Sequence, residues 1–206
     1  MIDTVEHFKK EKYAVIDNFV DNDTSFLLYH YVKTLVQSIN YKFTYQNEYY
    51  QKELDGQFQD PQAPGDFSKY GDPLFDTLLN LTCDKMSRIT GLNLTPQYSY
   101  HRLYTTDSEL VRHVDRPSCE VSATLCLGYD SDYEWPICLK KLDGTEVGYN
   151  LKPGSALVYR GCDVEHWREK FKGKHHAQVF FHYNETGGKY DNVYDGRPLL
   201  GINNRV

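Results

Sequence analysis

The feature that most restricts the fold is a series of short strand-like segments between residues 95 and 185. Each segment is rich in β-branched and aromatic residues, and turn-forming residues separate it from the next. Eight such segments are present: QYSYHRLY, LVRHVDRP, EVSATLCLGYD, WPICLKKL, VGYNLKP, SALVYRG, VEHWREKF and HAQVFFHY. Because no helical pattern lies between them, they predict a mainly β domain, either a sandwich or a barrel.

The N-terminal part predicts two helices that support this sheet. The β-rich run YAVIDNFV precedes a segment in which Asp23, or an adjacent Asn or Thr, is expected to cap a helix. The expected apolar stripe of that helix contains Phe26, Leu27, Tyr31, Leu35 and Ile39. A second helix is predicted from Pro73, near its first turn, to Gly91, just past its end.

The length of 206 residues suits a single domain spanning residues 1–206. Residues 1–94 are predicted to provide helical support and a surface loop, and residues 95–185 the strand-rich core. The surface loop is residues 41–71, which are aromatic, polar and interrupted by proline and glycine. Residues 186–206 are expected to form a tail whose apolar PLLGI segment packs back.

Charge and cysteine usage exclude several functions. The net charge is −6 and the pI is about 5.7, which argues against nucleic acid as the main ligand, since phosphate contacts need clustered Lys and Arg. The five cysteines form no CxxC motif, and no apolar stretch approaches the ~18 residues of a membrane span. We therefore expect a reduced, cytoplasmic protein without membrane contact. No oligomeric state follows from the sequence.

A histidine and an aspartate, His113 and Asp115, flank one valine in the segment LVRHVDRP. On a β-strand, residues two apart point to the same side, so both side chains could bind one metal ion. The chain has eight histidines, and chance alone predicts about one His-x-Asp pair in such a composition. The pair is therefore meaningful only if a third ligand lies on a late strand.

Four late histidines could supply that ligand: His166, His175, His176 and His182. His166 has the expected context, because the apolar strand SALVY ends at Arg-Gly, a short turn follows, and His166 opens the next strand. Two histidines and one carboxylate on one face of an octahedron are typical of non-haem Fe(II) sites. We favour His113, Asp115 and His166 as such a site.

Several segments resemble the Fe(II)- and 2-oxoglutarate-dependent oxygenases, in particular their prolyl 4-hydroxylase-like branch. LVRHVDRP resembles the pattern around the first two iron ligands, KPGSALVYRG the strand before the second iron histidine, and HHAQVFFHY the last core strand. YAVIDNFV resembles the usual entry into the fold. The resemblance implies a double-stranded β-helix, or jelly-roll, core of about eight antiparallel strands at residues 95–185, with helices before it.

The resemblance also implies the cofactors and the reaction. Fe(II) would be held by His113, Asp115 and His166, and 2-oxoglutarate and molecular oxygen would complete its coordination. The substrate would be hydroxylated while 2-oxoglutarate is converted to succinate and CO2, with ascorbate as an expected reductant. The most direct expectation is a prolyl or other residue in a protein or peptide as the substrate.

The co-substrate site departs from the family pattern. The basic residue expected about nine to eleven positions after the second iron histidine is replaced by His175, His176 and Ala177. Arg168 lies two residues after His166, on the same side of the strand, and a guanidinium suits bidentate capture of a carboxylate. We predict that Arg168 binds the C5 carboxylate of 2-oxoglutarate, with His175 as a helper.

Three further residues are candidates for supporting roles. Tyr104 and Thr124 could donate hydroxyl contacts to the co-substrate. Arg116 follows Asp115 directly, so it could orient that carboxylate from outside the metal shell or reach the substrate.

Other functions remain open at this stage. The same chemistry could act on a free amino acid or another small metabolite, and an enzyme of that kind should cover its cavity with the loop at residues 41–71. A nucleic-acid demethylase of the same superfamily is disfavoured by the acidic charge. A different class, a cupin-like isomerase or a jelly-roll binding module, is disfavoured because the short HxH pattern is absent.

Overall fold

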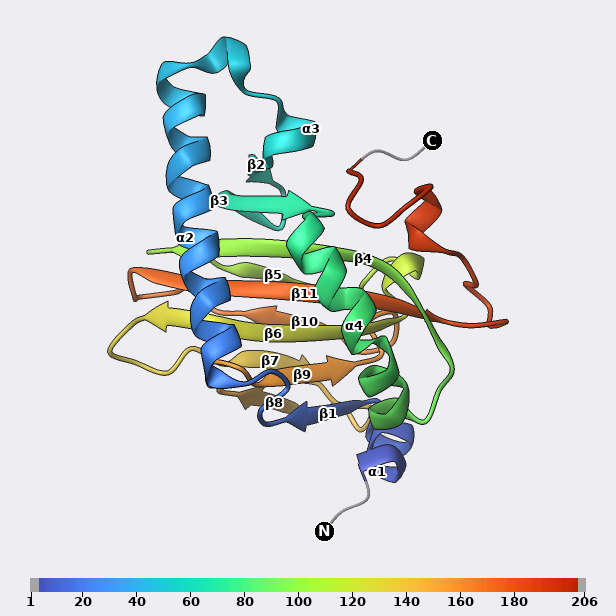
Figure 1. Ribbon diagram of the computed structural model, residues 1–206. Helices are drawn as coiled ribbons and strands as arrows, with labels where there is room; N and C mark the ends of the chain where they lie inside the picture. The colour runs from blue at the N-terminus through green and yellow to red at the C-terminus, as the bar shows by residue number, and fades with distance from the viewer. Residues whose placement is uncertain (1–3, 204–206) are drawn as a thin grey trace.

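The computed structural model describes residues 4–203 and contains all eight predicted core strands (Figure 1). These strands are β4 (Leu94–Thr105), β5 (Leu110–His113), β6 (Val121–Asp130), β7 (Ile137–Lys140), β8 (Glu146–Tyr149), β9 (Ala156–Tyr159), β10 (His166–Arg168) and β11 (His175–Glu185). Three N-terminal strands accompany them: β1 (Tyr13–Ile16), β2 (Gln57–Asp60) and β3 (Ala63–Tyr70).

The strands form two antiparallel sheets that face each other. The major sheet has the order β1-β9-β6-β11-β4-β3-β2, and the minor sheet has the order β5-β10-β7-β8. Along the chain the eight core strands pass back and forth between the sheets: β4, β6, β9 and β11 lie in the major sheet, and β5, β7, β8 and β10 in the minor sheet, where the consecutive strands β7 and β8 form a hairpin. This arrangement confirms the predicted double-stranded β-helix.

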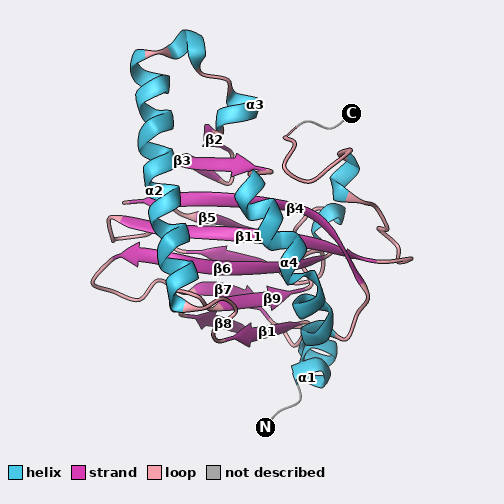
Figure 2. Ribbon diagram, in the orientation of Figure 1, coloured by secondary structure: helices cyan, strands magenta, loops and turns pink. Residues whose placement is uncertain are grey.

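Helices α2 (Asn22–Tyr45) and α4 (Pro73–Thr90) cover the outer face of the major sheet, and α1 (Thr4–Glu11) lies at the end of α4 (Figure 2). The prediction for α4 is confirmed at both ends. Asp72 accepts a hydrogen bond from the Leu74 amide at the start, and Gly91 adopts the left-handed conformation at the end. No helix in residues 4–203 is long and apolar enough to cross a membrane.

The predicted apolar stripe of α2 was correct at Ile39, which is buried, and at Tyr31, which packs against the main core, but wrong at Phe26 and Leu27. Leu28, Val32 and Ile39 are the buried hydrophobic residues, whereas Phe26 and Leu27 are each 66% exposed. The cap is Asp21, whose carboxylate accepts from the Thr24 amide at 2.7 Å, and not Asp23. Apolar residues stand on several sides of this helix, so only the contact with the sheet decides which side is buried.

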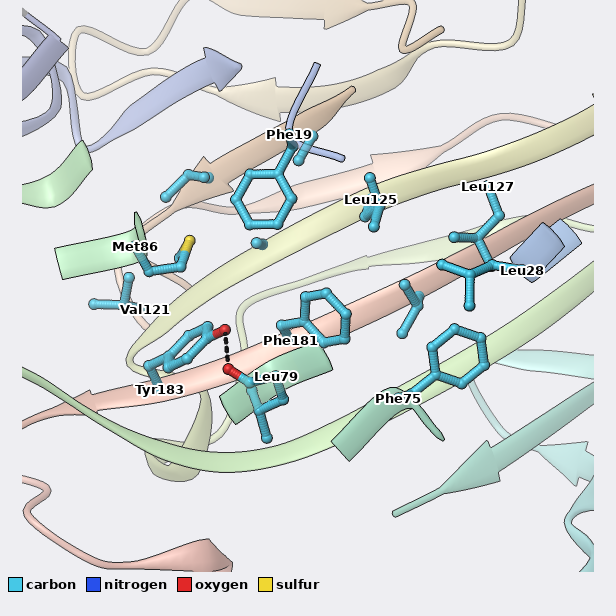
Figure 3. Close-up of a cluster of buried hydrophobic side chains, with 14 of the residues drawn as sticks. Phe19, Leu28, Phe75, Leu79, Met86, Val121, Leu125, Leu127, Phe181 and Tyr183 are labelled. Atoms are coloured by element: carbon cyan, nitrogen blue, oxygen red, sulfur yellow. Dashed lines mark hydrogen bonds between the residues drawn. The ribbon is translucent and has the colours of Figure 1, made fainter. Parts of the chain in front are cut away.

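The main core fills the layer between the helices and the major sheet (Figure 3). Phe75, Leu79 and Met86 of α4 pack there, together with inward residues of β6 and β11 such as Leu125 and Phe181. Tyr183 lies in the same layer and donates its hydroxyl to the Leu79 carbonyl at 2.9 Å. Residues of opposite parity on these strands therefore face the minor sheet and the barrel interior.

The segment at residues 41–71 is more ordered than a surface loop. Helix α2 continues to Tyr45, a 3-10 turn spans Asn47–Tyr49, and α3 spans Lys52–Asp55. β3 then joins the major sheet, with Phe67 opposite Leu103 of β4. The remaining short elements are 3-10 turns at Pro117–Cys119 and Tyr194–Gly196. In the tail, the side chain of Leu200 packs against the main core.

Candidate functional site

The fold brings the three predicted metal ligands together at one end of the barrel. His113 ends β5 and His166 begins β10, and the two residues are directly opposite in the antiparallel pair. Asp115 follows β5 by two residues. Its Oδ1 lies 3.5 Å from Nε2 of His113 and 3.6 Å from Nε2 of His166. The ligand atoms of the three residues all lie within 4.8 Å of one another, close enough to hold one metal ion.

Backbone contacts orient both imidazoles. Nδ1 of His113 lies 2.6 Å from the Val111 carbonyl, and Nδ1 of His166 lies 2.9 Å from the Val164 carbonyl. A carbonyl can only accept, so each Nδ1 carries the proton and each Nε2 presents a lone pair toward Asp115. Such outer contacts fix the tautomer and the ring orientation of a metal-binding histidine.

The carboxylate of Asp115 is held in its ionised form. Burial raises its pKa, but the neighbouring imidazoles of His113, His166 and His182 outweigh burial and lower the pKa to about 2. The other oxygen, Oδ2, accepts from Ser122 Oγ at 3.0 Å. Gly161 packs against it so closely that a Cβ would lie 2.4 Å from Oδ2. Two neutral imidazoles and one carboxylate form a donor set that fits Fe(II).

A cavity of about 960 Å³ opens above the three ligands. Tyr98, Tyr100, Arg102 and Phe180 from the major sheet form much of its wall. The segment at residues 52–62 contributes a second wall. The C-terminal tail also reaches the cavity, where the Asn203 amide donates to the carbonyls of Glu53 at 2.9 Å and Leu54 at 3.3 Å.

Arg168 is buried inside the barrel, on the same strand as His166 and with only 2% of its surface exposed. Its guanidinium donates to the Trp135 carbonyl at 2.6 Å and to Gln178 Oε1 at 2.8 Å, and no residue within 4–203 forms an ion pair with it. Burial lowers the pKa of Arg168, because the site disfavours an uncompensated charge. A buried cation without a carboxylate partner is suited to an anionic ligand.

The hydroxyl candidates lie near this arginine. Thr124 Oγ1 accepts from Gln178 Nε2 at 2.6 Å, so Thr124 reaches Arg168 through Gln178. Tyr104 is fully buried and packs edge-on against Trp135, whose ring also covers the Arg168 guanidinium. Arg168, Thr124 and Tyr104 do not line the 960 Å³ cavity; they lie deeper in the barrel.

The structure does not bring His175 to the site. His175 has the same parity on β11 as Ala177 and Val179, which pack beneath the helices, so its side chain leaves the barrel on that face. His176 points inward instead, against Trp135 and Tyr129. The prediction that His175 helps to bind the co-substrate is therefore wrong, because alternate residues of β11 point to opposite sides of the sheet and His175 points away from the barrel.

Arg116 lines the cavity, but its guanidinium is not directed at Asp115. It forms two hydrogen bonds with Asp195 of the C-terminal tail, at 2.9 and 2.7 Å, and lies over the ring of Tyr98. The predicted orienting contact to Asp115 is instead made by Ser122.

A second buried arginine, Arg102, was missed from the sequence, and unlike Arg168 it lines the cavity. Arg102 Nη2 pairs with Asp60 at 2.5 Å, and Nη1 donates to the Tyr104 hydroxyl at 3.1 Å. Asp60 ends β2 and Arg102 lies on β4, so the contact joins segments 42 residues apart. The alternation of QYSYHRLY places Arg102 on the same side as Tyr100 and Tyr104, which is the signal that could have identified it.

Comparison with known proteins supports this fold. No family model and no curated protein matches the sequence. Among solved structures, a Pseudomonas putida prolyl-4-hydroxylase has a TM-score of 0.64 at 16% identity and covers 89% of this chain and 98% of its own. EctD from S. alaskensis with bound Fe has a TM-score of 0.67 at 13% identity, covering 98% and 83%.

A third similar structure is HygX from Streptomyces hygroscopicus with nickel, 2-oxoglutarate and hygromycin B bound. Its TM-score is 0.60 at 15% identity, and the match covers 90% of this chain and 88% of that one. The chain therefore has the double-stranded β-helix fold of the 2-oxoglutarate- and Fe(II)-dependent oxygenases.

Proposed function

We propose that the protein is an Fe(II)- and 2-oxoglutarate-dependent dioxygenase that hydroxylates its substrate. The observation that carries this proposal is the geometry of His113, Asp115 and His166, which present two imidazole Nε2 atoms and one ionised carboxylate at a cavity. Three donors on one side of an ion leave positions for co-substrate and oxygen. The similar solved structures include proteins with Fe, and with 2-oxoglutarate, bound.

Arg168 would hold the C5 carboxylate of 2-oxoglutarate. It is the interior cation without an acidic partner among residues 4–203, whereas Arg102 is neutralised by Asp60. Gln178 and Thr124 would keep the guanidinium in place, and Tyr104 would close the same region of the barrel. When bound, iron and 2-oxoglutarate supply the oxidant from O2, with succinate and CO2 as products. The protein orients the groups and shields them from water.

A small molecule is a better substrate candidate than a residue in a folded protein. The segment at residues 52–62 and the C-terminal tail meet at the cavity, where Asn203 binds Glu53 and Leu54. Covering segments of this kind restrict a cavity to ligands that it can enclose. The similar structures include both possibilities, a prolyl-4-hydroxylase and the EctD and HygX complexes with 5-hydroxyectoine and hygromycin B. A prolyl residue in a peptide is the second candidate.

Anaerobic spectroscopy tests the oxygenase proposal. Adding Fe(II) and then 2-oxoglutarate without oxygen should produce a weak visible charge-transfer band in the wild-type protein. His113→Ala should lose the band, iron binding and uncoupled 2-oxoglutarate turnover, because it removes one of three ligands. Full 2-oxoglutarate turnover in His113→Ala, or no band and no 2-oxoglutarate binding in the wild type, would contradict the proposal.

Succinate release tests the substrate class. Free amino acids and other small polar metabolites should stimulate release above the uncoupled rate, and prolyl peptides should not. Asn203→Ala removes the contact between the tail and residues 53–54, so it should raise KM for the small substrate while 2-oxoglutarate binding is unchanged. Stimulation by peptides alone would favour the prolyl hydroxylase alternative.

A further inference from the structure

The hydroxyl of Ser122 lies between the metal-binding carboxylate and a buried histidine that is not part of the predicted metal site. Its Oγ is 3.0 Å from Asp115 Oδ2 and 2.9 Å from His182 Nδ1. Ser122 and His182 are opposite each other on β6 and β11, and both side chains point into the barrel. The register of the major sheet therefore creates this contact, which no local sequence motif encodes.

The protons in this group can be assigned. The Ser122 hydroxyl has one hydrogen and four neighbours: the carboxylate of Asp115, the Cys119 carbonyl at 3.2 Å, the Tyr159 hydroxyl and His182. The ionised carboxylate is the strongest acceptor, so the hydroxyl donates to Asp115 Oδ2. Its oxygen is then free to accept from His182, which requires a proton on Nδ1 of that histidine.

Neighbouring groups fix the orientation of His182. The ring of Tyr98 lies against it, with centroids 4.4 Å apart, and the Tyr98 hydroxyl is hydrogen-bonded to Cys119 Sγ at 2.9 Å. Ser122 is completely buried and His182 is 6% exposed. A side chain with this degree of packing cannot exchange its partner without cost.

We propose that Ser122 and His182 are positioning residues that hold Asp115 Oδ2, so that Oδ1 is directed at the metal between His113 and His166. This inference rests on the proposed iron site and adds two residues to it. His182 acts through Ser122, and Ser122 acts directly on the carboxylate. Removing partners that orient a metal ligand typically weakens metal binding by about 10- to 100-fold.

Cobalt binding provides a test that does not depend on turnover. The metal-free protein is titrated with Co2+, and affinity and the visible d–d spectrum are recorded. Wild type should bind one Co2+. Ser122→Ala should bind Co2+ about 10- to 100-fold more weakly with an altered spectrum. His182→Leu should weaken binding in the same direction, whereas His182→Asn should restore most of the affinity because its amide can donate from the position of Nδ1.

A double variant tests whether His182 acts on the metal site only through Ser122, which we call the relay. The alternative is that His182 and Ser122 affect metal binding independently. If His182 acts only through Ser122, adding His182→Leu to Ser122→Ala should cause little further loss. Additive losses would overturn the relay, and so would unchanged affinity in Ser122→Ala or equal affinity in His182→Leu and His182→Asn. Ser25→Ala is the matched control, since it removes a buried hydroxyl on α2 and should leave Co2+ binding unchanged.

Two other results of the cobalt titration can be told apart from loss of the relay. His182, Asp115 and Cys119 also lie close enough together to be considered as metal ligands themselves. A wild-type stoichiometry of two Co2+ that falls to one in His182→Leu would show that His182 is a ligand, which contradicts the relay. Absence of Co2+ binding in wild type, with the protein folded by thermal unfolding, would instead remove the proposed iron site.

Discussion

At the scale of single residues, the candidate metal site could be predicted from local spacing, but the contacts that support it could not. His113 and Asp115 point the same way because they are two apart on an extended segment, and His166 opens a late strand. Ser122, Gln178 and Arg102 contact partners on other segments of the fold, at sequence separations of 7 to 54 residues. Cross-strand register, which these contacts require, is not fixed by the sequence of one strand.

The role proposed for Arg168 leads to a prediction about the co-substrate. Arg168→Gln should raise KM for 2-oxoglutarate by about 10- to 100-fold, because hydrogen bonds to a charged group contribute about 1.5–3 kcal/mol. Co2+ affinity should change little, since Arg168 does not contact the three metal ligands. Steady-state kinetics and cobalt titration would measure the two effects separately.

Arg112→Gln is the matched control for this experiment. Arg112 is a partly exposed arginine on β5 that pairs with Glu146 and Glu165, so its loss should leave KM unchanged. A KM for 2-oxoglutarate in Arg168→Gln that equals that of wild type would show that another group binds the C5 carboxylate. Arg102 would then be the next residue to test, because it is buried and lines the cavity.

At the scale of elements, several predictions depended on which of two neighbouring residues faces the interior. On β11, His176 and Gln178 face the barrel while His175 and Ala177 face the helices. The consecutive histidines give no local signal for which of them is inside. The same difficulty affected α2, where Phe26 and Leu27 are apolar but exposed. In both cases tertiary contacts, and not local pattern, select the buried face.

Paired substitutions in α2 test the corrected burial. Leu28→Ala should lower the free energy of unfolding by about 2–5 kcal/mol, because it removes a core side chain and leaves a cavity. Phe26→Ala should change it by less than about 0.5 kcal/mol, since this side chain is largely exposed. Urea unfolding of both variants measures the difference. Equal losses would show that the stripe predicted from the sequence, which included Phe26, is also buried in solution.

At the scale of the whole molecule, the eight core strands and their order along the chain could be predicted because each of them has its own apolar segment and turn residues. The walls of the cavity could not be predicted from the sequence. β3 contains Pro64 and Gly65, which argue against a strand, yet Pro64 pairs with Gln59 of β2 and the second half of β3, from Phe67, pairs with β4. The tail reaches the cavity through the Asp195 contact with Arg116, which depends on the completed barrel. Long-range contacts therefore determine the walls of the cavity that would enclose the proposed substrate.

The buried histidines predict how the stability of the whole molecule depends on pH. His101 lies between Phe67 and Phe75, where no group of residues 4–203 forms a hydrogen bond with either ring nitrogen, and burial lowers its pKa to about 4. Between about pH 6.5 and 4 the unfolded chain therefore binds a proton that the folded protein does not, so stability falls as pH falls. The contribution of one such histidine is about 1.4 kcal/mol per pH unit.

His101→Leu should therefore flatten the decrease in unfolding free energy between pH 6.5 and 4 by about 1.4 kcal/mol per pH unit. His182, whose pKa burial also lowers to about 4, would account for a similar part of the remaining slope. Urea unfolding of the metal-free protein at several pH values measures the slope. Leu79→Ala should lower stability equally at every pH, because it removes core packing but no titrating group. An unchanged slope in His101→Leu would mean that His101 is protonated within the fold, and that the layer between the helices and the major sheet admits water beside it.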